Sequence, residues 1–133
     1  MEIDIQLDEN KAFRQFLDKQ LAAYNDAQSR WHREVRASGG GQPVDLIIRH
    51  EDDSIIAGLY GEMYWETFEI DRLWVHESTR HQQLGSKLVQ EAERIAERHQ
   101  CRYLHLTIFS FQAPDFYQYL GFEIVGEMRD FPP

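Results

Sequence analysis

One stretch of the chain combines residue types and spacing that suit the binding of an anion. The apolar segment Leu73–Val75 runs into a polar turn, and a helical pattern begins at Gly85 and Ser86. The first turn of a helix offers unpaired backbone N–H groups and the positive end of the helix dipole, which together favour a phosphate. Gly85 lets the backbone approach a ligand closely. The alternative is an ordinary helix start capped by Ser86, because a single glycine is a weak motif.

Two carboxylates lie close together just before this turn. Glu69 and Asp71 alternate with their neighbours, so in a strand they share one face with Leu73. Two carboxylates at this spacing raise the pKa of one of them, which suits a general base near neutral pH. The alternative is a solvated pair that only attracts a cationic substrate. Glu62 and Glu66, before these residues in the chain, are further candidates for the same pocket.

Other kinds of site find little support in the sequence. The six histidines are scattered, and none has a paired ligand spacing with a carboxylate, so we expect no metal site. The chain has no nucleophile elbow, paired-cysteine motif or dinucleotide glycine pattern. Cys101 is the single cysteine and precedes an apolar run, which favours a buried small residue over a nucleophile.

Composition indicates one soluble domain over residues 1–133, 42% of them hydrophobic. The net charge of −9 disfavours a nucleic-acid partner and favours a cationic or amine substrate, unless the acidity serves only solubility. We find no apolar run of membrane-spanning length and no signal peptide at Met1, so we expect a cytoplasmic protein with no membrane partner.

Hydrophobic periodicity predicts the elements that position these residues. We expect a strand at Ile3–Leu7, a helix capped near Asn10, a second helix ending near Ala37, and a flexible loop at residues 38–41. Period-two patterns predict strands at Val44–Arg49, Ile55–Trp65 and Phe68–Val75, which form an antiparallel meander. The last of these should place Phe68, Ile70, Arg72 and Trp74 on one face.

The second half of the chain predicts a strand–helix–strand unit. A helical stripe extends from Leu84 to Ala96, and a strand from Tyr103 to Phe109 should lie parallel to the strand before the helix. A short helix from Pro114 to Gly121 and a last strand at Phe122–Val125 complete the prediction.

Two segments carry a resemblance to a known family. Arg80–Ser86 resembles motif A of the GNAT superfamily of N-acetyltransferases: Arg80 and Gly85 match its outer positions, and Gln83 stands at its first glycine. Gln112–Phe122 is similar to motif B, an aromatic-rich helix before a Gly-Phe strand. One helix and one strand separate the two motifs, as in the family, and the resemblance extends from the first strand through residue 127.

This resemblance implies an α+β (mixed α/β) fold with a splayed mixed sheet, an antiparallel N-terminal half and helices on both faces. The sheet would open between the strand ending at Val75 and the strand Tyr103–Phe109. Acetyl-CoA would be the cosubstrate, with its pantetheine arm along Leu73, Trp74 and Val75. Its pyrophosphate would lie on the loop that contains Arg80, His81, Gln82, Gln83, Leu84, Gly85 and Ser86.

The implied reaction is transfer of an acetyl group to a primary amine by direct attack in a ternary complex. The acceptor would be a small cationic amine or the lysine or N-terminal amine of a peptide. Tyr117 matches the family's tyrosine acid, although it can also be a core aromatic with a satisfied hydroxyl. Glu69 matches the catalytic glutamate of histone-acetylating members, and Glu69 with Asp71 matches the histidine pair of the arylalkylamine branch. The N–H of Leu73 would stabilise the oxyanion.

Three departures from the family pattern keep an alternative open. Gln83 would be strained by about 1 kcal/mol if the family glycine there has a positive φ. Ser110 replaces a frequent asparagine, and the chain ends at residues 131–133, where the family's final strand is expected. Three explanations for the missing final strand stay open: a homodimer partner supplies it, the edge of the sheet is exposed, or the chain is shortened. The alternative functions are a non-catalytic acyl-CoA-binding regulatory module and an interaction domain with a vestigial site.

Overall fold

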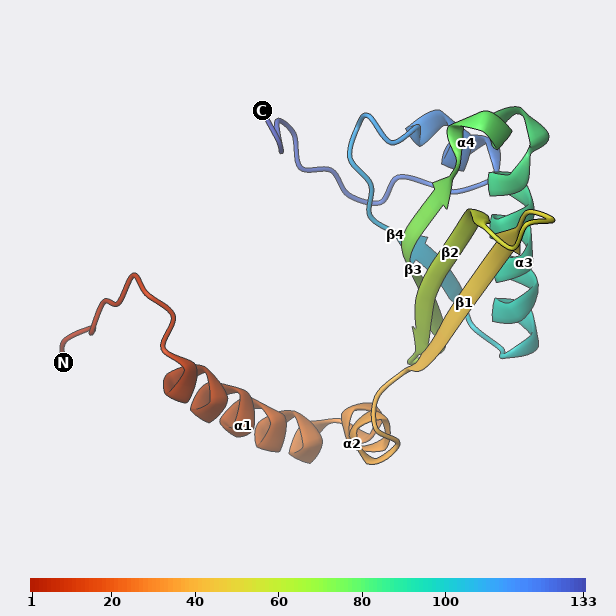
Figure 1. Cartoon of the computed structure of the whole chain (residues 1–133). Helices are drawn as coiled ribbons and strands as arrows, with labels where there is room; N and C mark the ends of the chain where they lie inside the picture. The colour runs from red at the N-terminus through yellow and green to blue at the C-terminus, as the bar shows by residue number, and fades with distance from the viewer. The chain divides into compact units, whose positions relative to one another are not determined.

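The computed structural model describes all 133 residues, which form two compact units, Met1–Gly40 and Gly41–Pro133. Two helices make the first unit, and the second contains a sheet with its helices (Figure 1). None of the helices combines the length and the apolar character that crossing a membrane requires.

The first unit consists of helices α1 (Lys11–Gln28) and α2 (Arg30–Ala37). The side chain of Asn10 accepts a hydrogen bond of 2.9 Å from the N–H of Phe13, so the predicted cap is confirmed. Ser29 separates the two helices. Its N–H donates to the carbonyl of Asn25 at the end of α1, and its hydroxyl oxygen accepts from the N–H of His32 at the start of α2.

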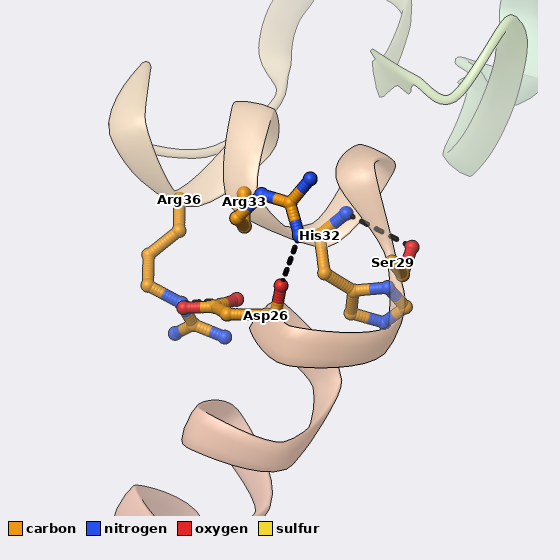
Figure 2. Close-up of polar contacts among 5 residues, drawn as sticks. All are labelled: Asp26, Ser29, His32, Arg33 and Arg36. Carbon is orange, nitrogen blue, oxygen red and sulfur yellow. Dashed lines mark hydrogen bonds and ion pairs between the residues drawn. The ribbon is translucent and has the colours of Figure 1, made fainter.

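Asp26 holds the corner between these two helices together (Figure 2). Its carboxylate accepts a hydrogen bond of 2.9 Å from Nε of Arg36, and its backbone carbonyl accepts from Nη1 of Arg33. The last carbonyls of a helix have no partner within that helix, so the guanidinium of Arg33 satisfies one of them. The two arginines of α2 thus fix the turn at Ser29.

The strand predicted at Ile3–Leu7 is wrong, because residues 1–10 form neither helix nor strand. Alternation of apolar and polar residues becomes a strand only where a neighbouring strand accepts its backbone hydrogen bonds, and the segment has no such pairing.

The second unit is built on a four-stranded sheet in the order β1-β2-β3-β4 (Figure 1). Strands β1 (Gln42–Arg49), β2 (Ile55–Tyr64) and β3 (Thr67–Val75) form the predicted antiparallel meander. Strand β4 (Tyr103–Leu106) lies parallel to β3 and follows helix α3 (Leu84–Arg98). The mixed α+β open sheet that the sequence predicted is therefore confirmed.

The core of this unit lies between α3 and one face of the sheet. The predicted helical stripe is buried at five positions, Leu84, Leu88, Val89, Ala92 and Ala96. These side chains contact apolar residues of the central strands, of which Ala57, Leu59, Met63, Phe68 and Ile70 are buried. This apolar interface fixes α3, and with it the loop before α3, against β2 and β3.

A β-bulge at Asp71 interrupts the pleat of β3. Tyr60 pairs with Arg72, and the next residue of β2, Gly61, pairs with Ile70, so Asp71 has no partner. One extra residue moves every later side chain to the opposite face.

The bulge corrects the predicted faces of β3. Phe68 and Ile70 are buried, but after the bulge it is Leu73 and Val75 that pack against the core, while Trp74 is exposed. The prediction that Arg72 and Trp74 share a face with Ile70 is therefore wrong. The prediction that Leu73 shares a face with Glu69 is wrong for the same reason.

The sheet opens where β3 and β4 part. Their pairing runs only from Thr67 with Tyr103 to Ile70 with Leu106. Beyond Ile70, β3 continues along β2 to Val75 with no strand on its other side, whereas β4 ends at Leu106. The predicted strand therefore stops short of Phe109, and the strand predicted at Phe122–Val125 does not form, because no strand pairs with that segment.

Candidate active site

Backbone groups of β3 face the opening between β3 and β4. The N–H of His76 donates to the carbonyl of Ile56 on β2 at 2.7 Å. Successive residues of a strand direct their N–H and C=O groups to opposite sides. By this alternation the groups of Val75 and Leu73 point away from β2, into the opening. The carbonyl of Val75 accepts a long hydrogen bond of 3.4 Å from Nε of Arg80, which brings the predicted anion-binding loop beside the opening.

Free backbone donors gather at the start of α3. A short 3₁₀ helix, η1 (Glu77–Gln82), leads from the sheet to Gln83, and α3 begins at Leu84. No side chain caps α3, so Ser86 is not the capping residue that the alternative interpretation required. The N–H groups of Leu84, Gly85 and Ser86 have no protein acceptor. His81 and Gln82, which the sequence also predicted to bind the cofactor, lie in the last turn of η1 just before these donors.

Gln83 has the left-handed backbone conformation that the family glycine suggested, with φ 59° and ψ 28°. A non-glycine residue there is strained by about 1–2 kcal/mol.

We expect Gln83→Gly to raise the free energy of unfolding by up to about 1 kcal/mol, because the lost strain exceeds the added chain entropy. Thermal unfolding measures this. Gln82→Gly is the matched control, since Gln82 has no positive φ; a lower stability for Gln83→Gly than for Gln82→Gly would contradict the prediction.

Gly85 serves packing as well as access to the loop. A Cβ atom at Gly85 would lie 3.2 Å from Cζ of Phe116 and 3.7 Å from Cγ2 of Val75. The missing side chain therefore lets helix α4 (Pro114–Tyr119) approach the start of α3 and the end of β3. The sequence suggested closeness to a ligand at Gly85 and gave no sign of Phe116, whose role depends on tertiary packing.

Tyr117 lies on α4 next to Phe116 and is half-buried. Its ring meets the rings of Phe116 and Phe122 edge to face, with centroids 4.9 and 5.8 Å apart. Burial raises the pKa of the Tyr117 hydroxyl, so the hydroxyl keeps its proton at neutral pH. This hydroxyl has no hydrogen-bond partner in the protein, while the ring packs against the core as in the alternative interpretation. Tyr119, its neighbour on the same helix, is 88% exposed.

Glu69 is the centre of a polar cluster on the face of the sheet opposite α3. The hydroxyl of Tyr64 donates to Oε2 of Glu69 at 3.1 Å, and Nε2 of His105 lies 3.9 Å from the same oxygen. Burial, followed by the charge of Glu69 and a hydrogen bond to it, raises the pKa of Asp71. The bulge thus leaves Asp71 beside Glu69, and the two predicted carboxylates do interact.

His105 is a member of this cluster that sequence reasoning missed. It is the Cα partner of Glu69 in the parallel pairing of β3 with β4. The sequence showed His105 only as one of several scattered histidines. Only the register between β3 and β4 could have indicated this contact, and α3 separates these two strands in the sequence.

The two further glutamates differ in position. Glu62 is the Cα partner of Glu69 across β2 and β3, so it lies beside the cluster. Glu66 belongs to the turn between these strands, and its carbonyl accepts from the N–H of Arg102. Burial, and then the charge of Glu66, raises the pKa of Cys101, which is the opposite of what a reactive thiolate needs.

Burial of Asp71 and its repulsion by Glu69 give a prediction for the pH dependence of stability. The raised pKa of Asp71 means that folding favours its protonated form, so its favourable contribution exists below the usual value of 3.8 and is lost as the pH rises. We expect Asp71→Asn to raise the melting temperature at pH 7 but not at pH 3. Asp45→Asn controls for the change in net charge. Equal shifts for both variants at pH 7 would count against the repulsion.

No three histidine, cysteine, aspartate or glutamate side chains in the structure are arranged to hold a metal ion.

The open mixed sheet, with β3 and β4 parting beside the uncapped start of α3, is the arrangement that the resemblance to N-acetyltransferases implied. Residues 7–122 match the sequence pattern described as the Acetyltransferase (GNAT) family, and the chain belongs to that family. The match begins in the first unit and ends after α4.

Relatives of known name agree with this assignment. The chain is 31% identical over 119 residues to a blasticidin-S acetyltransferase of Streptomyces morookaense, which covers 85% of this chain and 88% of that protein. An acetyltransferase structure from Bacillus cereus is 33% identical with a TM-score of 0.80, covering 97% of this chain and 89% of the other. A glucosamine-6-phosphate N-acetyltransferase from Arabidopsis thaliana, 21% identical with a TM-score of 0.59 over 72% of this chain and 69% of its own, shares the fold.

Proposed function

We propose that the chain is an acetyl-CoA-dependent N-acetyltransferase that acts on a primary amine by direct attack in a ternary complex. One observation carries the proposal: Gly85 lies between Val75, at the opening of the sheet, and Phe116, whose ring contacts that of Tyr117. The free backbone donors at the start of α3 and the open end of β3 thus lie beside α4, the helix that carries Tyr117.

The groups present fit the cosubstrate. Uncapped N–H groups at Leu84, Gly85 and Ser86 suit a pyrophosphate, with Arg80 on the same loop. The outward-facing backbone of Leu73 and Val75 suits the amide groups of a pantetheine arm. Acetyl-CoA would supply the thioester whose acyl group is transferred. The N–H of Leu73 would then stabilise the oxyanion that develops during attack.

Proton transfers are assigned to two side chains of the protein. Attack requires a neutral amine, and Glu69 is the proposed base, supported by Asp71 at its side. Tyr117 is the proposed acid, because burial keeps its hydroxyl protonated and no protein group engages it. The cluster on the sheet face is acidic, so a cationic acceptor is favoured: a small amine, or the lysine or N-terminal amine of a peptide. We further propose that residues 1–133 work as one catalytic domain in the cytoplasm.

The test is release of free thiol from acetyl-CoA across a panel of amines. The panel contains polyamines, lysine peptides, aminoglycosides and, because of the Streptomyces relative, blasticidin S. We expect turnover with at least one cationic amine and a rise in melting temperature with acetyl-CoA alone. Binding without turnover would instead support the non-catalytic acyl-CoA module, which the strained Gln83 favours. Absence of both would refute the assignment.

A further inference from the structure

His105 and Glu69 come from strands that pair directly but belong to distant parts of the chain. Their Cα atoms are partners in the β3–β4 ladder, and Nε2 of His105 lies 3.9 Å from Oε2 of Glu69. The His105 and Glu69 side chains are 48% and 38% exposed, respectively. A carboxylate at the proposed amine site therefore has a titratable neighbour that solvent can reach.

The other members of the cluster lie around this pair on β2 and β3. On β2, Tyr64 donates to the same oxygen of Glu69 and so holds one edge of its carboxylate. Asp71 also bonds Glu69, from the bulge on the same strand. Glu62 lies opposite Glu69, and Arg72 follows Asp71 on β3. Helix α3 packs on the other face of the sheet, against Leu104 and Leu106, so it places no charged group beside His105.

A base that takes a proton from each new substrate must also lose that proton before the next turnover. We propose that His105 is the relay that removes this proton from Glu69 after each turnover. The proposal rests on the proposed N-acetyltransferase function. The substrate ammonium gives one proton to the Glu69 carboxylate and becomes a neutral amine. Glu69 passes that proton to Nε2 of His105, which releases it to water. No electrons change hands, and Glu69 and His105 both return to their starting states.

The distance of 3.9 Å between Nε2 of His105 and Oε2 of Glu69 is too long for a hydrogen bond. A small movement of either side chain on substrate binding would bring the two atoms within hydrogen-bond distance. Catalytic hydrogen bonds are often long in free enzymes and shorten in the complex with substrate. A half-exposed imidazole can close this gap by rotation about its side-chain bonds. His105 acts through Glu69 and touches no reacting atom in this scheme, so it is a positioning and relay residue rather than a catalytic one.

The test compares His105→Gln, Glu69→Gln and the double variant in the thiol-release assay, with His99→Gln as the control. His99 lies at the C-terminal end of α3, outside the site, and its substitution should leave turnover unchanged. We expect His105→Gln to lower kcat about 10- to 100-fold, with the KM for acetyl-CoA and the melting temperature unchanged. In the double variant His105→Gln should add little to the loss from Glu69→Gln, because residues that act as a unit are not additive.

Added imidazole separates a relay from a structural role. Free imidazole should restore most of the turnover of His105→Gln and none of that of Glu69→Gln. Wild-type turnover by His105→Gln, additive losses in the double variant, or absence of rescue would each overturn the relay. A wild-type chain that releases no thiol with any amine would overturn the proposed function itself, and the relay with it, which distinguishes that failure from the others.

Discussion

Replacement of Tyr117 by phenylalanine should lower kcat by at least about 100-fold. The departing thiolate of the reaction needs a proton, and a positioned acid contributes about 10²- to 10⁴-fold. Burial raises the pKa of Tyr117, so the hydroxyl is protonated over the whole neutral range. The phenylalanine ring keeps the edge contacts with Phe116 and Phe122, and the fold should therefore be unchanged.

Tyr119→Phe is the matched control on the same short helix. Tyr119 is 88% exposed and has no role in the proposed site, so its variant should turn over at the wild-type rate. Thermal shifts with acetyl-CoA should be equal for both variants, because neither change touches the loop at Leu84–Ser86. If Tyr117→Phe and Tyr119→Phe have the same kcat, Tyr117 is not the acid.

Gly61→Ala should be the most destabilising single-methyl change in the sheet. A Cβ atom at Gly61 would overlap the backbone carbonyl oxygen of Glu69 and come within 2.8 Å of Cε1 of Phe68, which is fully buried. Backbone must move to make room, and such overpacking costs about 1–3 kcal/mol or more. We expect a loss of about 3 kcal/mol, or roughly 10 °C in melting temperature. Because the displaced carbonyl belongs to Glu69, kcat should fall as well.

Gly58→Ala provides the comparison within the same strand. Its Cβ would lie 3.3 Å from the carbonyl oxygen of Leu46, a close contact that a small shift relieves. We expect a loss below about 1 kcal/mol and little change in kcat. Chemical denaturation of the two variants measures the difference. Equal losses would show that the bulge opposite Gly61 is not a rigid part of the site.

Local signals predicted the elements that are determined locally. The cap at Asn10, the stripe from Leu84 to Ala96 and the Pro114 helix start all depend on residues within one or two helical turns. The meander also followed from the chain, because short turns join its strands. The segments at Ile3–Leu7 and Phe122–Val125 have strand-like alternation, but a strand exists only with a partner, which no local pattern specifies.

The candidate site was predictable where a motif identified it and not where packing did. Arg80, Gly85 and Tyr117 came from motif spacing, and the left-handed Gln83 from the glycine it replaces. The bulge at Asp71 adds one residue to an otherwise regular pattern, and nothing in residues 67–75 marks it; it is defined by pairing with Gly61. The contact of His105 with Glu69 likewise depends on the register between β3 and β4.

The parting of β3 from β4 has a consequence for how the free protein moves. Only four residue pairs, from Thr67–Tyr103 to Ile70–Leu106, join the meander to β4. The amide hydrogens of Leu73 and Val75 face no neighbouring strand, so in the free protein they should exchange with deuterium far faster than that of His76, which is bonded to Ile56. A bound molecule that pairs with this edge would slow their exchange. The edge of β3 would then report occupancy of the opening without any turnover.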